Sequence, residues 1–295
     1  ILVLAFLNFA ADARQQPELF DYDRNKPIEY EEKSAAENKN VRHREIVYAS
    51  PKGGMVTATL LEPRKKKSGK IAAIVYLHGA GTNRLQFLPE ASKIVETGKF
   101  AALLIDLPSA RPAPWKKSEY DSLESDREMR IQTVVDARCG VDLLETLPQI
   151  DKTRIALVGY SYGAATGGIL ASIEKRLSAF VLIASGGSQI DFWNDEKNAD
   201  AVNLKKILKE ERFKKFVETL KPVEQIDYIK NSTAPIFFQF AERDESPSAD
   251  AMLKFYEAAS EPKNVKWYDE THRLNAQATA DRLRWLKKQL KQTKK

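Results

Sequence analysis

Cysteine and histidine are scarce in this chain. Its 295 residues include one cysteine, Cys139, and three histidines. A single thiol excludes both an intramolecular disulfide framework and a metal cluster held by thiolates. Cys139 falls within an apolar helical pattern, where a small buried thiol is expected rather than a reactive one. The few histidines also limit any search for a catalytic base to three positions.

A long apolar run that could span a bilayer is lacking as well. The apolar segment at residues 1–10 is too short, and it is followed by Ala11-Asp12-Ala13, the A-x-A pattern of a signal cleavage site. We therefore expect residues 1–13 to be part of a secretory signal cleaved after Ala13. The protein would then be secreted or periplasmic, with no stable membrane insertion. The alternative is that this segment is an apolar strand or helix of the folded domain.

Neither sign of charge dominates strongly. Lysine and arginine outnumber aspartate and glutamate by 47 to 41, for a net charge of +6. The basic clusters at 64–67, 205–221 and 287–295 do not interleave aromatic residues in a nucleic-acid-binding pattern. We expect solvated surface there and no nucleic-acid partner, with contact to an anionic membrane face as the alternative.

Short apolar runs alternate with helical patterns from about residue 41 onward. Continuous apolar runs are typical of strands buried on both faces of a parallel sheet, and their alternation with helices predicts an α/β fold. We expect a mostly parallel sheet of about eight strands, led by an antiparallel hairpin, with helices on both faces. The strands are expected at residues 44–49, 55–61, 71–77, 100–107, 154–158, 180–184, 235–240 and 265–268, and the helices at 85–97, 127–147, 162–174, 248–259 and 276–290.

Two further segments complete the expected domain organisation. Residues 14–40 are polar and charged, and we expect them to form an extended arm ahead of one domain at 41–295. Residues 187–232 contain no strand pattern and carry apolar residues at helical spacing. They predict a small helical cap inserted over the sheet edge. A helix lying on a membrane is the alternative, because this segment is rich in lysine.

The strongest chemical signal is Gly159-Tyr160-Ser161-Tyr162-Gly163, a G-x-S-x-G between an expected strand and an expected helix. A serine on such a tight turn adopts a strained backbone conformation, and side chains two residues away on either side would collide. The strain exposes the hydroxyl above the sheet. We therefore expect Ser161 to be a nucleophile.

A second glycine-rich turn, His78-Gly79-Ala80-Gly81, follows the first buried strand. The backbone N–H groups of Ala80 and Tyr162 are the expected oxyanion hole, which stabilises negative charge on a reacting carbonyl oxygen. His78 is expected to fasten this turn rather than to act as the base.

The base and the acid follow from chain order. A triad on this architecture runs serine, acid, histidine, and only His272 lies downstream of Ser161. Asp244, after the expected strand at 235–240, is the expected acid. The rival carboxylates are Asp191, which follows the preceding strand, and Glu242, Glu245 and Asp269.

Loops near the expected site supply candidates for substrate contact. These are polar, basic or aromatic residues that could line a pocket or pack within their own loops: Asn83, Arg84, Arg111, Trp115, Tyr160, Phe192 and Trp193.

From about residue 42 to 290 the chain resembles the α/β-hydrolase superfamily. The matching segments are 78–81, 154–163, 242–247 and Thr271-His272. The pattern is most similar to dienelactone-hydrolase-like and prolyl-oligopeptidase-like esterases, the latter because Tyr162 directly follows the nucleophile. The resemblance departs in three ways. The base is usually preceded by glycine, whereas Thr271 precedes His272 here. Dienelactone hydrolases use a cysteine nucleophile, and oligopeptidases carry a β-propeller that residues 14–40 cannot form.

The resemblance implies acyl transfer through a covalent intermediate, with no metal or organic cofactor. We expect a small-molecule ester substrate, with short acyl chains favoured. A small serine peptidase or amidase with the same triad is the first alternative. A non-catalytic binding protein on the same scaffold is the second.

Overall fold

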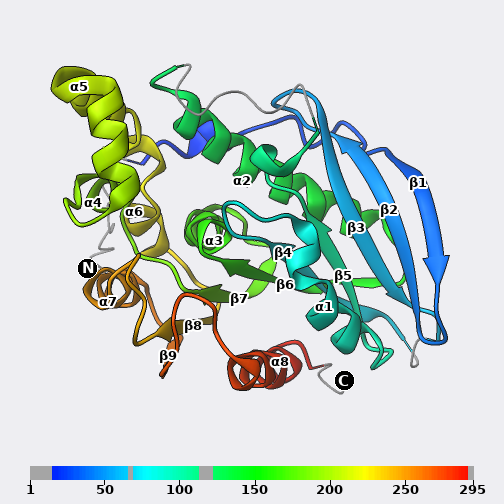
Figure 1. Ribbon diagram of the computed structural model, residues 1–295. Helices are drawn as coiled ribbons and strands as arrows, with labels where there is room; N and C mark the ends of the chain where they lie inside the picture. The colour runs from blue at the N-terminus through cyan, green and yellow to red at the C-terminus, as the bar shows by residue number, and fades with distance from the viewer. Residues whose placement is uncertain (1–14, 66–68, 113–121, 292–295) are drawn as a thin grey trace, which may run out of the picture.

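A computed structural model describes residues 15–65, 69–112 and 122–291 of the chain. One nine-stranded sheet runs through this part, in the order β1-β2-β3-β5-β4-β6-β7-β8-β9 (Figure 1). The strands are β1 (Tyr30–Glu37), β2 (Val41–Ala49), β3 (Met55–Pro63), β4 (Ile71–Leu77), β5 (Phe100–Ile105), β6 (Ile150–Tyr160), β7 (Leu177–Ile183), β8 (Ile236–Ala241) and β9 (Lys263–Tyr268). β1, β2 and β3 pair antiparallel, β3 pairs antiparallel with β5, and the remaining six strands are parallel.

Helices cover both faces of the sheet, as the apolar runs predicted. The helices are α1 (Leu88–Val95), α2 (Ser125–Thr146), α3 (Tyr162–Ile173), α4 (Gln189–Asn194), α5 (Ala199–Thr219), α6 (Gln225–Ile229), α7 (Ala249–Ala258) and α8 (Ala276–Gln289), with short 3₁₀ turns η1 (Pro17–Phe20), η2 (Arg84–Phe87), η3 (Pro108–Ala110) and η4 (Lys221–Val223). Side chains of α2, α3 and α7 share one apolar core with the sheet, and those of α1 and α8 share the other.

The central strand β4 shows why its sequence is continuously apolar. All seven of its residues are buried. Ala73, Val75 and Leu77 belong to one core, whereas Ala72 and Ile74 belong to the other. Successive side chains of a strand point to opposite faces, so a strand covered on both sides needs apolar residues at every position.

The sheet has nine strands rather than the expected eight, because part of the predicted N-terminal arm forms β1. Most of β1 is exposed, so its residues are polar and gave no apolar signal. β1 is held by backbone pairing with β2 at the edge of the sheet. Charged side chains are common on such edges because they discourage pairing with further chains.

The arm also contributes to the core ahead of β1. Phe20 is fully buried, and its ring lies edge-on to Tyr228 of α6, with 5.7 Å between the ring centroids. The Arg138 Nη1 group of α2 donates to Phe20 O at 2.7 Å. Residues 15–37 are therefore part of the folded domain.

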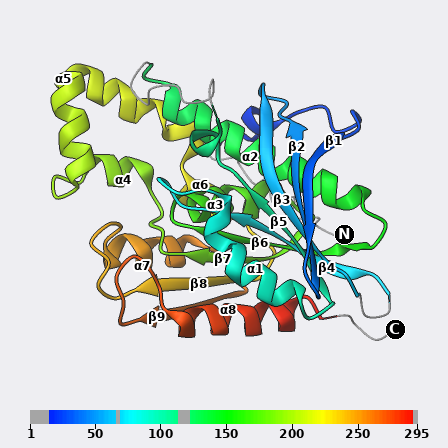
Figure 2. The same ribbon diagram turned by 45° about the vertical axis from the view of Figure 1, so that its right-hand side comes forward.

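The expected cap segment contains α4, α5 and α6, and no strand. α5 is bent at Lys209, whose φ is 62°, and it projects away from the sheet (Figures 1 and 2). α6 instead packs against α3 in the body of the domain. No helix within the described ranges is both long and apolar enough to cross a membrane.

We expect Phe20→Ala to lower the free energy of unfolding by about 3–5 kcal/mol, because it empties a buried aromatic site. Glu18→Ala, at an exposed position of the same 3₁₀ turn, is the matched control and should stay within about 0.5 kcal/mol of the parent. Urea unfolding measures both. Equal, small effects would mean that the arm is not part of the cooperative fold.

Candidate active site

The turn between β6 and α3 holds Ser161 in an unusual backbone conformation. Its φ is 52° and its ψ is −113°, although residues other than glycine seldom adopt a positive φ. The Ser161 N–H donates to Ile183 O of β7 at 2.8 Å, and Ser161 O accepts from the N–H groups of Ala164 and Ala165. Hydrogen bonds on both sides therefore impose this strained turn, and such strain is common at functional sites.

Gly159 and Gly163 make the turn possible because they leave space for backbone atoms. A Cβ atom at Gly159 would lie 2.4 Å from Gly163 O, and one at Gly163 would lie 2.2 Å from Leu77 O. Neither oxygen can move without disturbing the sheet or the start of α3. The steric reason expected for the two glycines of the motif is therefore present.

The turn after β4 brings Ala80 close to Ser161. A Cβ atom at Gly79 would lie 2.7 Å from the Tyr160 ring and 3.4 Å from Ser161 Cβ, so a larger residue would push the two turns apart. Ala80 and Ser161 line the same two cavities. The N–H of Tyr162 belongs to the first turn of α3, where backbone N–H groups point out of the end of a helix.

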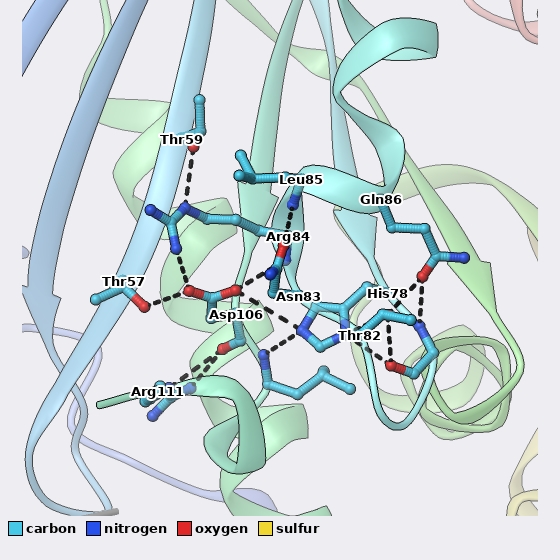
Figure 3. Close-up of polar contacts among 12 residues, drawn as sticks. Thr57, Thr59, His78, Thr82, Asn83, Arg84, Leu85, Gln86, Asp106 and Arg111 are labelled. Atoms are coloured by element: carbon cyan, nitrogen blue, oxygen red, sulfur yellow. Dashed lines mark hydrogen bonds and ion pairs between the residues drawn. The ribbon is translucent and has the colours of Figure 1, made fainter. Parts of the chain in front are cut away.

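His78 fastens the Ala80 turn through both ring nitrogens. The Leu107 N–H donates to His78 Nε2 at 3.0 Å, which places the ring proton on Nδ1, 2.7 Å from Gly79 O (Figure 3). The side chain is 1% exposed, and its burial lowers the pKa of His78. A buried ring with both nitrogens in use is a structural element, as the sequence indicated.

His272 and Asp244 lie in contact on the two loops that follow β9 and β8. The distance between His272 Nδ1 and Asp244 Oδ2 is 2.7 Å, and the Asp244 side chain is 2% exposed. The Ser246 N–H donates to the other carboxylate oxygen of Asp244 at 3.1 Å. The Tyr160 hydroxyl donates to His272 O at 2.9 Å and so ties the histidine loop to the serine turn.

Ser161 and His272 line a common cavity of about 740 Å³. Among the hydrogen bonds of the described residues, none joins Ser161 Oγ to the His272 ring. Hydrogen bonds of this kind are often long until a substrate is bound.

The rival carboxylates point elsewhere. Asp191 lies 3.7 Å from Lys254 Nζ, and its side chain is 58% exposed. Asp269 pairs with Arg243 at 2.8 Å. Glu242 and Glu245 are exposed. Of the five candidate acids, Asp244 is the one whose carboxylate contacts His272.

The candidates for substrate contact divide between two cavities. Tyr160 and Asn83 line the smaller cavity, although the Asn83 side chain also accepts from the Leu85 N–H at the start of η2. Phe192 and Trp193 of α4 line a larger cavity of about 1520 Å³, which Ser161 also lines. Trp115 lies outside the described residues.

Arg84 and Arg111 line neither cavity, which corrects the expectation that they face a substrate. Arg84 forms an ion pair with Asp106 and donates to Thr59 (Figure 3). It also forms an ion pair with Glu45. Arg111 is 1% exposed and donates to Asp136 Oδ2 at 2.7 Å. Both arginines thus tie loops to the body of the domain through carboxylates distant in sequence.

Sequence reasoning missed Arg130 of α2, a buried cation on the wall of the larger cavity. It is 4% exposed and donates to Asp126 Oδ2 at 3.2 Å and to Gln189 Oε1 at 2.6 Å. Its guanidinium carbon lies 4.5 Å from the centroid of the Tyr162 ring. Because Gln189 is the first residue of α4, Arg130 connects the cap to the residue that follows Ser161.

A metal site is not apparent. The described ranges contain no group of three or more histidine, cysteine, aspartate or glutamate side chains placed to hold a metal ion.

The burial of His78 predicts a pH dependence of stability. Its folded-state pKa is lowered, so the unfolded chain binds a proton below pH 6.5 that the folded chain does not. Stability should therefore fall below pH 6.5, by up to about 1.4 kcal/mol per pH unit for this one group. Nitrogen NMR of the ring checks the cause: neutral His78 should carry its proton on Nδ1, and its pKa should lie below the ordinary value for histidine. A pKa at or above that ordinary value would contradict the assignment.

Comparisons with known proteins agree with this architecture. A family model described as alpha/beta hydrolase family matches residues 74–289. The chain is similar to an acetyl xylan esterase from Paenibacillus sp. R4, at 18% identity and a TM-score of 0.77 over 92% of this chain and 91% of that one. It is also similar to acetyl xylan esterase 1 from Thermoanaerobacterium sp. JW/SL YS485, at 16% identity and a TM-score of 0.76 over 95% and 96%.

Peptidases of the same fold are similar over a smaller share of their length. Dipeptidyl peptidase 4 from Porphyromonas gingivalis matches at 16% identity and a TM-score of 0.64, over 84% of this chain but 35% of that one. No curated protein matches the chain by sequence. The family match covers well over half of the chain, and the strained serine turn lies within it: the chain belongs to the alpha/beta hydrolase family.

Proposed function

We propose that this protein is a serine hydrolase that cleaves carboxylic esters through an acyl-enzyme intermediate. The observation that carries the proposal is the contact between His272 and the buried Asp244 carboxylate, together with the cavity that His272 shares with the strained Ser161. The same three residue types, in the same chain order, form the triad of α/β hydrolases.

In this mechanism His272 is the general base. Its Nε2 takes the proton of Ser161 Oγ as that oxygen attacks the ester carbonyl. Asp244 holds the ring proton on Nδ1, which leaves Nε2 as the acceptor, and then stabilises the imidazolium. Because the carboxylate is almost fully buried, its attraction to the imidazolium is weakly screened by water.

The backbone N–H groups of Ala80 and Tyr162 are the proposed donors to the carbonyl oxygen as it becomes negative. Each such donor contributes about 3–4 kcal/mol of transition-state stabilisation. His78 supports this role indirectly, because it bonds the Gly79 carbonyl and the Leu107 N–H and so holds the Ala80 turn in place. The His272 imidazolium then protonates the departing alcohol, and water releases the acyl group by the same steps in reverse.

We favour esters over peptides as substrates because the chain covers a larger share of the similar esterases than of the similar peptidase. The two acetyl xylan esterases match over nearly their whole length, whereas the dipeptidyl peptidase matches over about a third. A small peptidase or amidase would use the same triad and remains the second candidate.

Short acyl chains are favoured by the polar character of the cap. The apolar residues of α5, including Leu204, Leu208 and Phe216, are buried, and the lysines of the helix lie exposed. Ile207 is the one large apolar side chain of α5 that is strongly exposed, at 61%. A lid that opens onto lipid would present a broader apolar face.

The larger cavity combines apolar side chains such as Phe192, Trp193 and Phe216 with many polar groups. A long alkyl chain there would displace water from hydroxyl and carboxylate groups without replacing their hydrogen bonds. Its lining includes the serines Ser109, Ser122, Ser125, Ser185, Ser188, Ser246 and Ser248, the carboxylates Asp126, Glu128, Asp191, Asp195, Asp200 and Asp250, and the cations Lys52, Arg130 and Lys254.

The triad predicts distinct effects for its members. Ser161→Ala should abolish ester cleavage and fluorophosphonate labelling with almost no change in Tm.

Asp244→Asn should lower kcat by roughly 10⁴, because the His272 ring would adopt the wrong tautomer. Asp191→Asn is the matched control and should be mild. Labelling of Ser161→Ala at another serine, or a severe effect of Asp191→Asn with a mild one of Asp244→Asn, would overturn the assignment.

The acyl preference is tested with p-nitrophenyl esters of increasing chain length, assayed with and without anionic vesicles. Acetate or butyrate should give the highest kcat/KM, and vesicles should not activate the enzyme, because the cap offers little apolar surface to a membrane. A preference for chains of about twelve carbons or more, or strong activation by vesicles, would show that the cap is a lipid-sensing lid.

A further inference from the structure

Ser161 lines both cavities, but most of the other lining residues belong to one cavity alone. Ala80 and Ser161 line both cavities, but His272 lines the smaller one and not the larger one. In ester hydrolysis, this asymmetry assigns the leaving alcohol and the acyl group of the substrate to different cavities.

The leaving alcohol must lie on the side of His272. When the tetrahedral intermediate collapses, the bond between the carbonyl carbon and the alcohol oxygen breaks, and that oxygen takes a proton from the imidazolium. A proton donor must lie within hydrogen-bond reach of the atom that it protonates. The alcohol therefore departs into the smaller cavity, and a short acyl group faces the part of the larger cavity beside Ser161.

The smaller cavity carries an excess of positive charge. Its lining includes Lys93, Arg273 and Arg282, and its one lining carboxylate is Glu90. Arg282 Nε lies 2.8 and 2.9 Å from the two Glu90 oxygens, so these buried residues neutralise each other. Within the described ranges, neither Lys93 nor Arg273 forms an ion pair.

Other charges leave this excess in place. The nearby Asp244 carboxylate is buried behind His272. Burial and the charge of Asp244 raise the pKa of Tyr160 to about 12, and the charge of Arg273 opposes them, so Arg273 also acts electrostatically on this cavity. In the larger cavity the balance is reversed, because carboxylates outnumber cations there.

We propose that the smaller cavity selects esters whose leaving alcohol carries an anionic group such as a carboxylate, with Lys93 and Arg273 as the residues that attract it. This inference rests on the proposed function and specifies the substrate class of the same site. The two cations come from separate elements, α1 and the loop before α8, and both line the smaller cavity.

Matched acetate esters test the preference. In 4-acetoxybenzoate the leaving group carries a carboxylate, and in 4-acetoxybenzamide it carries a neutral amide of similar shape. After correction for their uncatalysed hydrolysis rates, the ratio of kcat/KM for the carboxylate to that for the amide should exceed one. The ratio should fall as salt is added, because salt screens exposed charges.

Variants assign the preference to the two cations. Lys93→Gln and Arg273→Gln should each lower the ratio by about three- to fivefold, the range expected for one partly exposed charge pair. Arg273→Lys should retain most of it. Lys152→Gln, an exposed residue near the opposite end of β6 from Ser161, makes the same charge change away from the cavities and should leave the ratio unaltered.

The outcomes separate this inference from the function on which it rests. If none of the acetate esters is cleaved, the proposed function fails. If both are cleaved at a ratio near one, or if Lys93→Gln and Arg273→Gln leave the ratio unchanged, ester hydrolysis stands and the leaving-group proposal is overturned. A second pair checks the assignment of sides: a carboxylate on the acyl group, as in monophenyl succinate compared with phenyl acetate, should not be favoured.

Discussion

The left-handed backbone of Ser161 is the constraint on which the rest of the site depends. It joins β6 to α3 through one residue, and Ser161 lines both cavities there while Tyr162 begins the helix. The turn requires Gly159 and Gly163, because a Cβ atom at either position would overlap backbone. The hydrogen bonds of the sheet and the contacts of the helix around this turn offset the free-energy cost of its strained conformation. A change that relaxed this turn would therefore disturb the proposed nucleophile and the proposed oxyanion site together.

Much of the fold could be predicted because its signals are local. A strand such as β4, buried on both faces, must be apolar throughout, and a strained serine turn must carry small residues. The contact of His272 with Asp244 agrees with the order expected along the chain. β1 could not be found this way: an edge strand needs only backbone pairing, and its side chains remain exposed and polar.

Charged side chains explain the errors at the site. The sequence shows that Arg84 and Arg111 lie near the serine turn, but it does not show where their carboxylate partners are. Asp106 and Asp136 hold these arginines in the body of the domain, 22 and 25 residues away along the chain. Arg130 was missed for the same reason, because a helical pair with Asp126 looks the same whether it is exposed or buried. Whether an arginine faces a cavity depends on ion pairs with carboxylates that are distant along the chain. A single sequence does not show which carboxylate pairs with which arginine.

The packing of the first residues on α6 has a consequence for the order of assembly. The Gln16 N–H donates to the Tyr228 hydroxyl, and the Phe20 ring packs against the same tyrosine, so segments about two hundred residues apart close one core. During synthesis from the N-terminus these contacts cannot form until α6 has been made. The sheet must hold the early strands together without them, and contacts of such high sequence separation are slow to form. The emerging chain thus keeps one side of its core open until α6 has been translated.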